Sequence, residues 1–132
     1  IYVYDELYER GLTNDKLADA VRDKIGSAPV VCDSAEPKSI AELQQYGVSA
    51  TKSRKGKDSI IHGIQWLQQQ SIVIDRSCVN TKNEISTAHW KEDANGNALP
   101  KPSEKNNHLL DAGRYAHEED MRGTIETIAS LY

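Results

Sequence analysis

Apolar residues recur along this chain with two different periods, and the alternation between the periods predicts an α/β fold. Four short runs rich in β-branched and apolar residues are typical of strands. They are Ile1 to Tyr8, Val30 to Asp33, Val48 to Thr51 and Ile72 to Asp75. The segments between these runs place apolar residues three or four positions apart, which is the spacing of one helix face. Strands that alternate with helices in this way indicate a layered fold with a partly parallel sheet.

The predicted helices begin and end at residues suited to those positions. Thr13 or Asn14 is placed to cap the first helix, which ends near Gly26. Pro37 suits the first turn of the second helix, which Gly47 is placed to terminate. Further helices are expected within Ser59 to Leu67, from Asn80 to His89, from Asn106 or Asn107 through Tyr115, and at the end of the chain with Ile125, Ile128 and Leu131 on one face.

Two segments late in the chain predict irregular structure. Asp93 to Asn97 is rich in Asp, Asn and Gly, which predicts a tight turn within a small hairpin. Pro100 and Pro102 follow, and we expect both in a loop.

Length and composition limit the class of protein. A chain of 132 residues can bury a real core, and we expect residues 1–132 to form a single domain. The chain is 38% hydrophobic and 27% charged, which is typical of a soluble globular protein. No apolar run approaches the roughly 20 residues that cross a bilayer, so we expect a cytoplasmic protein. Because the chain opens directly on a strand pattern, without a leader or an initiator methionine, we expect it to be part of a longer polypeptide.

Asp33 is the sharpest candidate for a functional residue. It closes an apolar strand, so its carboxylate should project from the carboxyl edge of the sheet, where open α/β sheets place their ligands. The same residue could instead organise the turn before Pro37, with Ser34. The sequence pattern alone does not decide between a ligand role and a turn-forming role for Asp33.

His108 and Asp111 form a second candidate site. Residues three apart share a helix face, so these two side chains can address one point. The alternative is an ordinary surface ion pair between Asp111 and Arg114, with His108 as a plain polar residue. Carboxylates that cluster suit Mg²⁺ or Mn²⁺, because hard ions prefer oxygen ligands. Two such ions about 4 Å apart can catalyse hydrolysis of a phosphodiester.

A basic segment runs from Lys52 to Lys57 and includes Lys52, Arg54, Lys55 and Lys57. The net charge of −4 argues against nucleic-acid binding through overall charge, so any DNA contact must come from such a local patch. The segment could hold a phosphate backbone, or it could be a solvated loop. No glycine-rich phosphate loop of the Walker type is present, so the sequence offers no support for an ATPase.

Three stretches taken together resemble the nuclease domain of large terminase subunits from tailed phages and prophages. They are Val30 to Leu43, the basic segment leading into Ser59 to Leu67, and Asn107 to Tyr115. The resemblance extends over about Ile1 to Glu118. Each motif alone is weak evidence for this family, but the order and spacing of the three together are specific to it.

The resemblance implies a ribonuclease-H-like mixed sheet flanked by helices, in a domain that cuts concatemeric viral DNA with two divalent ions, Mg²⁺ or Mn²⁺. Asp33 and Asp111 then match two of the family's acidic ligands, and His108 matches a histidine near the metal centre. Lys52, Arg54, Lys55 and Lys57 resemble a basic segment close to the DNA. The implied partners are double-stranded DNA, the terminase ATPase domain, the small terminase subunit and the portal protein, in the cytoplasm of a bacterial host.

One departure from the family pattern concerns its first acid. That acid lies on a strand before the one represented by Ile1 to Tyr8, so we expect this sequence to lack the first strand and one ligand, and to cleave weakly or not at all. Asp5 and Glu6 do not match the acid. Two other functions stay open, a non-catalytic DNA-binding or assembly module of the same fold, and another ribonuclease-H-like nuclease such as a resolvase. A module that only binds DNA would show no cleavage that depends on divalent ions. A resolvase would prefer branched DNA to linear duplex.

Overall fold

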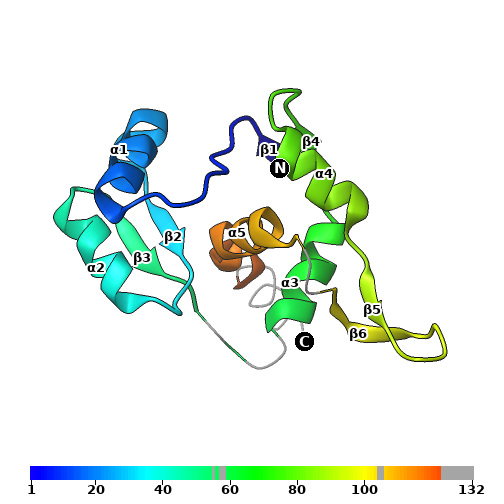
Figure 1. The fold of residues 1–132 in the computed structure, drawn as a ribbon. Helices are drawn as coiled ribbons and strands as arrows, with labels where there is room; N and C mark the ends of the chain where they lie inside the picture. Colours follow the sequence, from blue (N-terminus) through cyan, green and yellow to red (C-terminus); the bar gives the residue numbers. More distant parts are fainter. Residues whose placement is uncertain (55, 57–58, 104–105, 123–132) are drawn as a thin grey trace, which may run out of the picture. The chain divides into compact units, whose positions relative to one another are not determined.

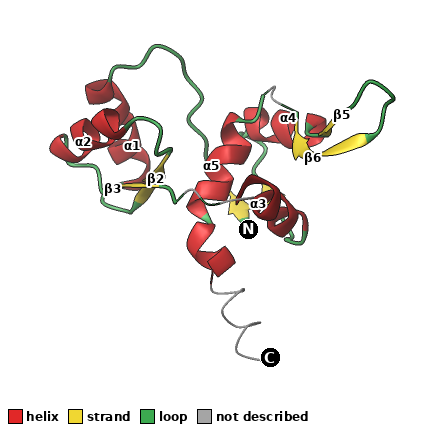
Figure 2. Ribbon diagram, turned by 90° about the horizontal axis from the view of Figure 1, so that it is seen from below, coloured by secondary structure: helices red, strands yellow, loops and turns green. Residues whose placement is uncertain are grey.

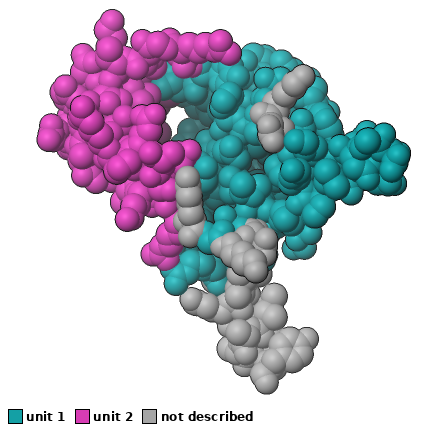
Figure 3. All heavy atoms as spheres, turned by 60° about the horizontal axis from the view of Figure 1, so that its bottom comes forward, with its two compact units in different colours: residues 1–8, 56–132 teal, residues 9–55 magenta. Residues whose placement is uncertain are grey.

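The computed structural model of the chain describes residues 1–54, 56, 59–103 and 106–122. It divides into two compact units, which are shown in different colours in Figure 3. Unit 1 comprises residues 1–8 together with the chain from Gly56 onward, and unit 2 comprises Glu9–Lys55. In the described part of the chain, no helix has the length and apolar character needed to span a membrane.

Unit 2 is a small layer of two parallel strands and two helices (Figure 1). Its elements are α1 (Asn14–Ile25), β2 (Val30–Cys32), α2 (Pro37–Gln45) and β3 (Ala50–Lys52). Val30 pairs with Ala50 and Cys32 with Lys52, so α2 is the crossover between parallel neighbours. The core consists of small and branched apolar residues from the helices and from the β3 side of the layer. Its buried members are Ala18, Ile40, Leu43, Val48 and Ala50.

In its described residues, unit 1 contains a parallel strand pair, an antiparallel hairpin and three helices (Figure 2). Its elements are β1 (Tyr2–Val3), α3 (Ser59–Gln68), β4 (Val73–Ile74), α4 (Val79–Thr87), β5 (Trp90–Glu92), β6 (Ala98–Pro102) and α5 (His108–Ala116). Strand β1 pairs in parallel with β4, and β5 pairs antiparallel with β6. Helix α5 packs against both α3 and α4. This packing positions His108 and Asp111.

The helices agree with the sequence prediction to within a residue or two at most ends, because their apolar faces are set by local spacing. The first strand is shorter than predicted, since β1 ends at Val3 and residues 4–8 leave the ladder. The reason is that the Glu6 side chain is drawn to the start of α4, where it accepts hydrogen bonds from Asn80 and Thr81. The helix predicted around Ile125, Ile128 and Leu131 lies outside the described residues.

The hairpin confirms one prediction and corrects another. Asp93 accepts hydrogen bonds from the backbone N–H groups of Asn95 (2.8 Å) and Asn97 (2.9 Å), and Gly96 has a φ of 80°, so the predicted tight turn is present. Pro100 and Pro102, however, lie in β6 and not in a loop. Proline is tolerated because β6 pairs with β5 alone among the described strands, so its open edge needs no N–H donor.

Candidate functional site

Asp33 lies at the position that its sequence predicts, immediately after β2 at the carboxyl end of the parallel pair. The residue is exposed, and its Oδ1 accepts a hydrogen bond from the Ala35 N–H at 3.0 Å. The turn-forming interpretation is therefore correct for this oxygen. An ionised carboxylate offers about four lone-pair sites, so the turn hydrogen bond and a ligand role are compatible.

The basic segment begins at the same edge of unit 2. Lys52 is the register partner of Cys32, so Asp33 and Ser53 follow directly from paired strand ends. The Ser53 N–H donates to the Cys32 carbonyl oxygen at 2.7 Å, which extends the alignment by one residue. Lys52 and Arg54 are exposed, whereas Lys55 and Lys57 lie outside the described residues. An acid and at least two cations therefore share this edge.

Helix α5 of unit 1 carries the other two predicted site residues. His108 is its first residue and is exposed, and its ring lies 6.4 Å from that of Tyr8. Asp111 lies one turn later, with 45% of its side chain exposed. Its Oδ1 accepts a hydrogen bond from Arg114 Nη2 at 2.9 Å, so the predicted ion pair is present. His108 and Asp111 lie one turn apart on α5 in unit 1, while Asp33 belongs to unit 2.

Arg114 is a buried cation, with only 8% of its side chain exposed. Its stem passes against Gly63 of α3, and its guanidinium carbon lies 5.0 Å from the centre of the Tyr115 ring. The Nε atom is buried and has no hydrogen-bond partner among the described residues. Burial of a charge is costly unless it is paired, so Arg114 depends on Asp111, and it holds one Asp111 oxygen in a fixed direction.

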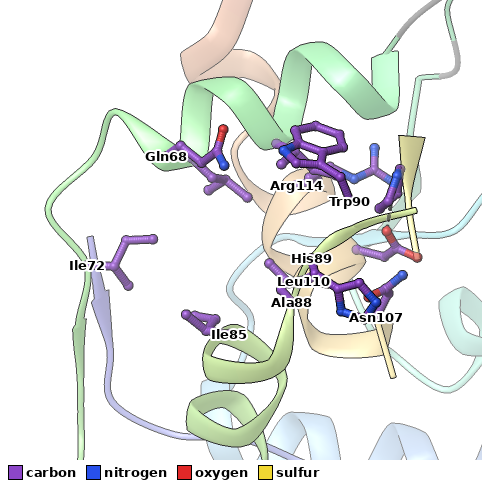
Figure 4. A pocket seen from close by; sticks show the side chains of 13 residues that line it. Gln68, Ile72, Ile85, Ala88, His89, Trp90, Asn107, Leu110 and Arg114 are labelled. Carbon is purple, nitrogen blue, oxygen red and sulfur yellow. Dashed lines mark hydrogen bonds and ion pairs between the residues drawn. The ribbon is translucent and has the colours of Figure 1, made fainter. Parts of the chain in front are cut away.

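Asp111 and Arg114 also line an apolar cavity of about 270 Å³ in unit 1. Figure 4 shows Ile72 and Ile85 on one side of this cavity and Trp90 and Arg114 on the other. Most of its lining is apolar, and the cavity opens to solvent.

Glu84 is a residue that the sequence analysis missed. It is buried in α4, with 4% of its surface exposed, and its Oε2 accepts hydrogen bonds from the N–H groups of Leu109 (2.7 Å) and Leu110 (3.2 Å). These are donors of the first turn of α5. No local signal indicates the role, because the acceptor is 25 residues from its first donor.

The predicted ligands, considered unit by unit, have the types of donor atom that a hard divalent cation accepts. Asp33 and Asp111 supply exposed or partly exposed carboxylate oxygens, and His108 supplies an imidazole nitrogen one turn from Asp111. Mg²⁺ and Mn²⁺ prefer oxygen ligands and tolerate a nitrogen. Within the described residues, no group of three or more His, Cys, Asp or Glu side chains is close enough to hold a metal ion.

Comparison with known proteins identifies the relatives of this chain. Residues 1–119 match a family model described as the terminase ribonuclease-H-like domain. The chain is 39% identical over 127 residues to the terminase large subunit of Bacillus phage SPP1, and 29% identical over 130 residues to the PBSX phage terminase large subunit of Bacillus subtilis. These alignments cover 92% and 94% of the chain but 30% of either relative.

Solved structures give the same result. The crystal structure of the nuclease domain of the SPP1 large terminase with bound manganese matches with a TM-score of 0.84 and 38% identity, over 90% of this chain and 70% of that one. The large terminase of the thermophilic bacteriophage D6E matches with a TM-score of 0.61 and 27% identity, over 79% of this chain and 28% of that one. The ribonuclease-H-like fold predicted from the sequence is thereby confirmed.

Proposed function

We propose that this chain, which belongs to the family of terminase ribonuclease-H-like domains, supplies metal ligands and DNA contacts to a nuclease domain that cleaves double-stranded DNA with the help of divalent metal ions, and that the chain alone cleaves weakly. The proposal rests on one observation above all. The chain matches the nuclease domain of the SPP1 large terminase with bound manganese, over 90% of its length and with a TM-score of 0.84. We assign the activity to a single domain in a longer large subunit, since the chain spans 30% of the length of its two curated relatives.

Three residues are proposed as metal ligands, namely Asp33, Asp111 and His108. Asp33 presents its carboxylate at the end of β2, where its turn hydrogen bond holds one oxygen in place. Asp111 is oriented by Arg114, and His108 lies one turn before it. A pair of Mg²⁺ or Mn²⁺ ions, when bound, supplies Lewis acidity for phosphodiester hydrolysis. The residues of the chain fix the ligand positions, and mainly apolar side chains line the cavity beside Asp111.

The basic segment is proposed to bind the DNA backbone. Lys52 and Arg54 lie at the carboxyl edge that also carries Asp33, so a phosphate bound to them would be held near a ligand carboxylate. Lys55 and Lys57 continue the segment. By family resemblance, we further propose that the domain works in the host cytoplasm beside a terminase ATPase domain, the small terminase subunit and the portal protein.

The test is cleavage of supercoiled plasmid across a Mn²⁺ titration by the full-length large subunit and by three single variants of it, since only weak cleavage is expected of the chain alone. Asp33→Asn and Asp111→Asn should lose metal-dependent cleavage by about 100-fold or more while the fold persists, because each removes ligand charge and keeps shape. Asp75→Asn is the matched control. Asp75 also follows a parallel strand and accepts a turn hydrogen bond, from the Ser77 N–H at 2.9 Å, but it is not a proposed ligand.

The outcomes separate the possible functions. Cleavage that survives in both Asp33→Asn and Asp111→Asn would overturn the ligand assignment. Equal loss in Asp75→Asn would show that the turns, and not the ligands, matter. DNA binding without any cleavage, at every Mn²⁺ concentration, would instead favour a binding or assembly module.

A further inference from the structure

Helix α5 has its first turn capped by a side chain from another helix. Glu84 of α4 accepts hydrogen bonds from the N–H groups of Leu109 and Leu110, at 2.7 and 3.2 Å. These N–H groups are the second and third of the helix, the donors that an N-cap side chain ordinarily satisfies. Glu84 thus replaces the local N-cap side chain as the acceptor for these N–H groups, although it is 25 residues away in the sequence.

The residue at the N-cap position does not take this role. Asn107 makes no side-chain cap hydrogen bond, and its Nδ2 donates to the carbonyl oxygen of Ser103. The Asn107 carbonyl accepts the Asp111 N–H at 2.8 Å, as an N-cap carbonyl should. Among the described residues, Glu84 therefore supplies the side-chain acceptor for the first turn of α5.

Helix α4, which carries Glu84, is also capped by a side chain from elsewhere in the chain. Helix α4 begins at Val79, and Glu6 caps it from the segment after β1, accepting the N–H groups of Asn80 (3.0 Å) and Thr81 (2.8 Å). The side chains of Asn80 and Thr81 also donate to Glu6, at 2.9 and 2.7 Å. Because α4 packs on α5, a fixed α4 makes Glu84 a fixed point for its neighbour.

We propose that Glu84 is a positioning residue of the metal site, which sets where His108 and Asp111 stand by fixing the first turn of α5. This inference rests on the proposed function, since it gives the helix start a role in metal binding. His108 is the first residue of α5 and Asp111 is in its first turn, so a fraying or tilting turn would move both ligands together. Groups that orient ligands commonly change metal affinity by about 10- to 100-fold when they are mutated.

The unpaired oxygen of Glu84 makes a sharp test possible. Oε1 is buried and has no hydrogen-bond partner among the described residues, so an amide group placed there displaces no bond. Glu84→Gln therefore keeps the length of the side chain and an acceptor oxygen but loses the charge. Glu84→Asp keeps the charge but is one methylene too short to reach Leu109 and Leu110. The two variants therefore separate the effect of the position of the carboxylate oxygen from the effect of its charge.

The experiment measures Mn²⁺ affinity, by the electron paramagnetic resonance signal of free Mn²⁺, and backbone amide exchange at Leu109 and Leu110. We expect Glu84→Gln to bind Mn²⁺ within about threefold of the unaltered chain. Glu84→Asp and Glu84→Ala should bind about 10-fold more weakly or worse, with faster exchange at both amides. Glu42→Ala is the control, because Glu42 also accepts a part-buried hydrogen bond, from Asn14, but within unit 2.

Several outcomes would overturn the inference. Affinity unchanged in Glu84→Asp and Glu84→Ala, with Asp111→Asn binding weakly, would remove the positioning role while leaving the proposed function intact. Weak Mn²⁺ binding in Glu84→Gln, with the affinity of Glu84→Asp unchanged, would make the charge of Glu84 and not its position the cause. If the unaltered chain binds no Mn²⁺, or if Asp111→Asn binds equally well, the proposed function and the inference fail together. Should Glu84→Ala not fold, as judged by circular dichroism, the Gln and Asp variants decide.

Discussion

Two glycines in neighbouring helices of unit 1 have opposite environments. A Cβ atom on Gly63 would lie 2.9 Å from Arg114 Cδ and 3.2 Å from Arg114 Cγ. These atoms belong to the middle of a buried side chain that is held by Asp111, so they cannot move aside without breaking that pair. At Gly113 of α5, no described atom lies within 4 Å of the same position, apart from its chain neighbours and the backbone of its own helix. The glycine in α3 is thus needed for close approach, and the one in α5 is not.

We expect Gly63→Ala to destabilise the protein by about 1 kcal/mol, and Gly113→Ala to stabilise it by up to about 1 kcal/mol. Alanine in a helix gains about 1 kcal/mol over glycine, while overpacking a core costs about 1–3 kcal/mol. The two terms oppose each other at Gly63, and only the first applies at Gly113. Urea unfolding of the two variants measures both signs. A Gly63→Ala variant as stable as Gly113→Ala would contradict the close packing of Arg114.

At the level of elements, both α4 and α5 are capped by a carboxylate from elsewhere in the chain. Neither N-cap residue, Cys78 or Asn107, makes a side-chain cap. Glu6 and Glu84 supply the acceptors, each to two successive backbone N–H groups. A negative group at a helix start is also favoured by the helix dipole. These helices are therefore stabilised by tertiary contacts more than by their own sequences.

The pH dependence of stability should reveal the cap made by Glu6. Partial desolvation raises the pKa of Glu6, but the hydrogen bonds from Thr81 and Asn80 outweigh it and place the pKa below its ordinary value of 4.5. A depressed folded-state pKa means that the cap contributes fully above about pH 4.5, and that the contribution is lost as the pH falls through the folded pKa. Glu6→Gln should therefore be less stable than the unaltered chain at pH 7, with the gap narrowing towards pH 3.

Urea midpoints at several pH values check this expectation. Asp75 and Asp93 also have lowered pKa values, through hydrogen bonds from Ser77 and from Asn97 and Asn95, so both chains should lose stability in acid. Only the difference between the chains reports on Glu6. A difference that does not change with pH would count against the cap.

For the whole molecule, nucleic-acid binding must overcome a net charge of −4. Replacing Lys52, Arg54, Lys55 and Lys57 by glutamine should weaken binding to all duplex sequences alike. It should also make the dependence of log affinity on log salt shallower, by about 0.9 for each phosphate that the protein no longer neutralises. Fluorescence anisotropy over a series of KCl concentrations measures both quantities.

The control for this change removes the same charge elsewhere. It replaces Arg10, Lys16, Lys24 and Lys101 by glutamine. The two variants have equal net charge, so a difference in salt slope reports on local phosphate binding alone. Equal slopes would make the basic segment an ordinary solvated surface.

A metal that binds the folded chain should also stabilise it. Mn²⁺ at about 100 times its dissociation constant should add about 2.7 kcal/mol, and excess chelator should remove that gain. Asp33→Asn and Asp111→Asn should each abolish most of the gain, although these residues belong to different units, because both are proposed to serve the same metal cluster. Thermal melts with and without Mn²⁺ check this. A full gain in either variant would show that its carboxylate is not a ligand.

Features that depend on local spacing could be predicted from the sequence. Apolar periodicity located the helices, the acid after Val30 to Cys32 marked a sheet edge, and a spacing of three placed His108 and Asp111 on one helix face. The order of the motifs indicated the family, which the comparisons then showed. Each of these inferences needs only residues that are near one another in the chain, or the order in which short motifs follow each other.

Contacts between residues that are far apart in the sequence, in contrast, are decided by tertiary packing. Glu84 reaches α5 across 25 residues and Glu6 reaches α4 across 74, and Arg114 is buried because Gly63 leaves room for its stem. The two prolines of β6 are tolerated in a strand because the open edge of β6 needs no backbone N–H donor. A buried carboxylate or cation is stable only beside its partner, and local pattern does not specify which partner packing will bring to it.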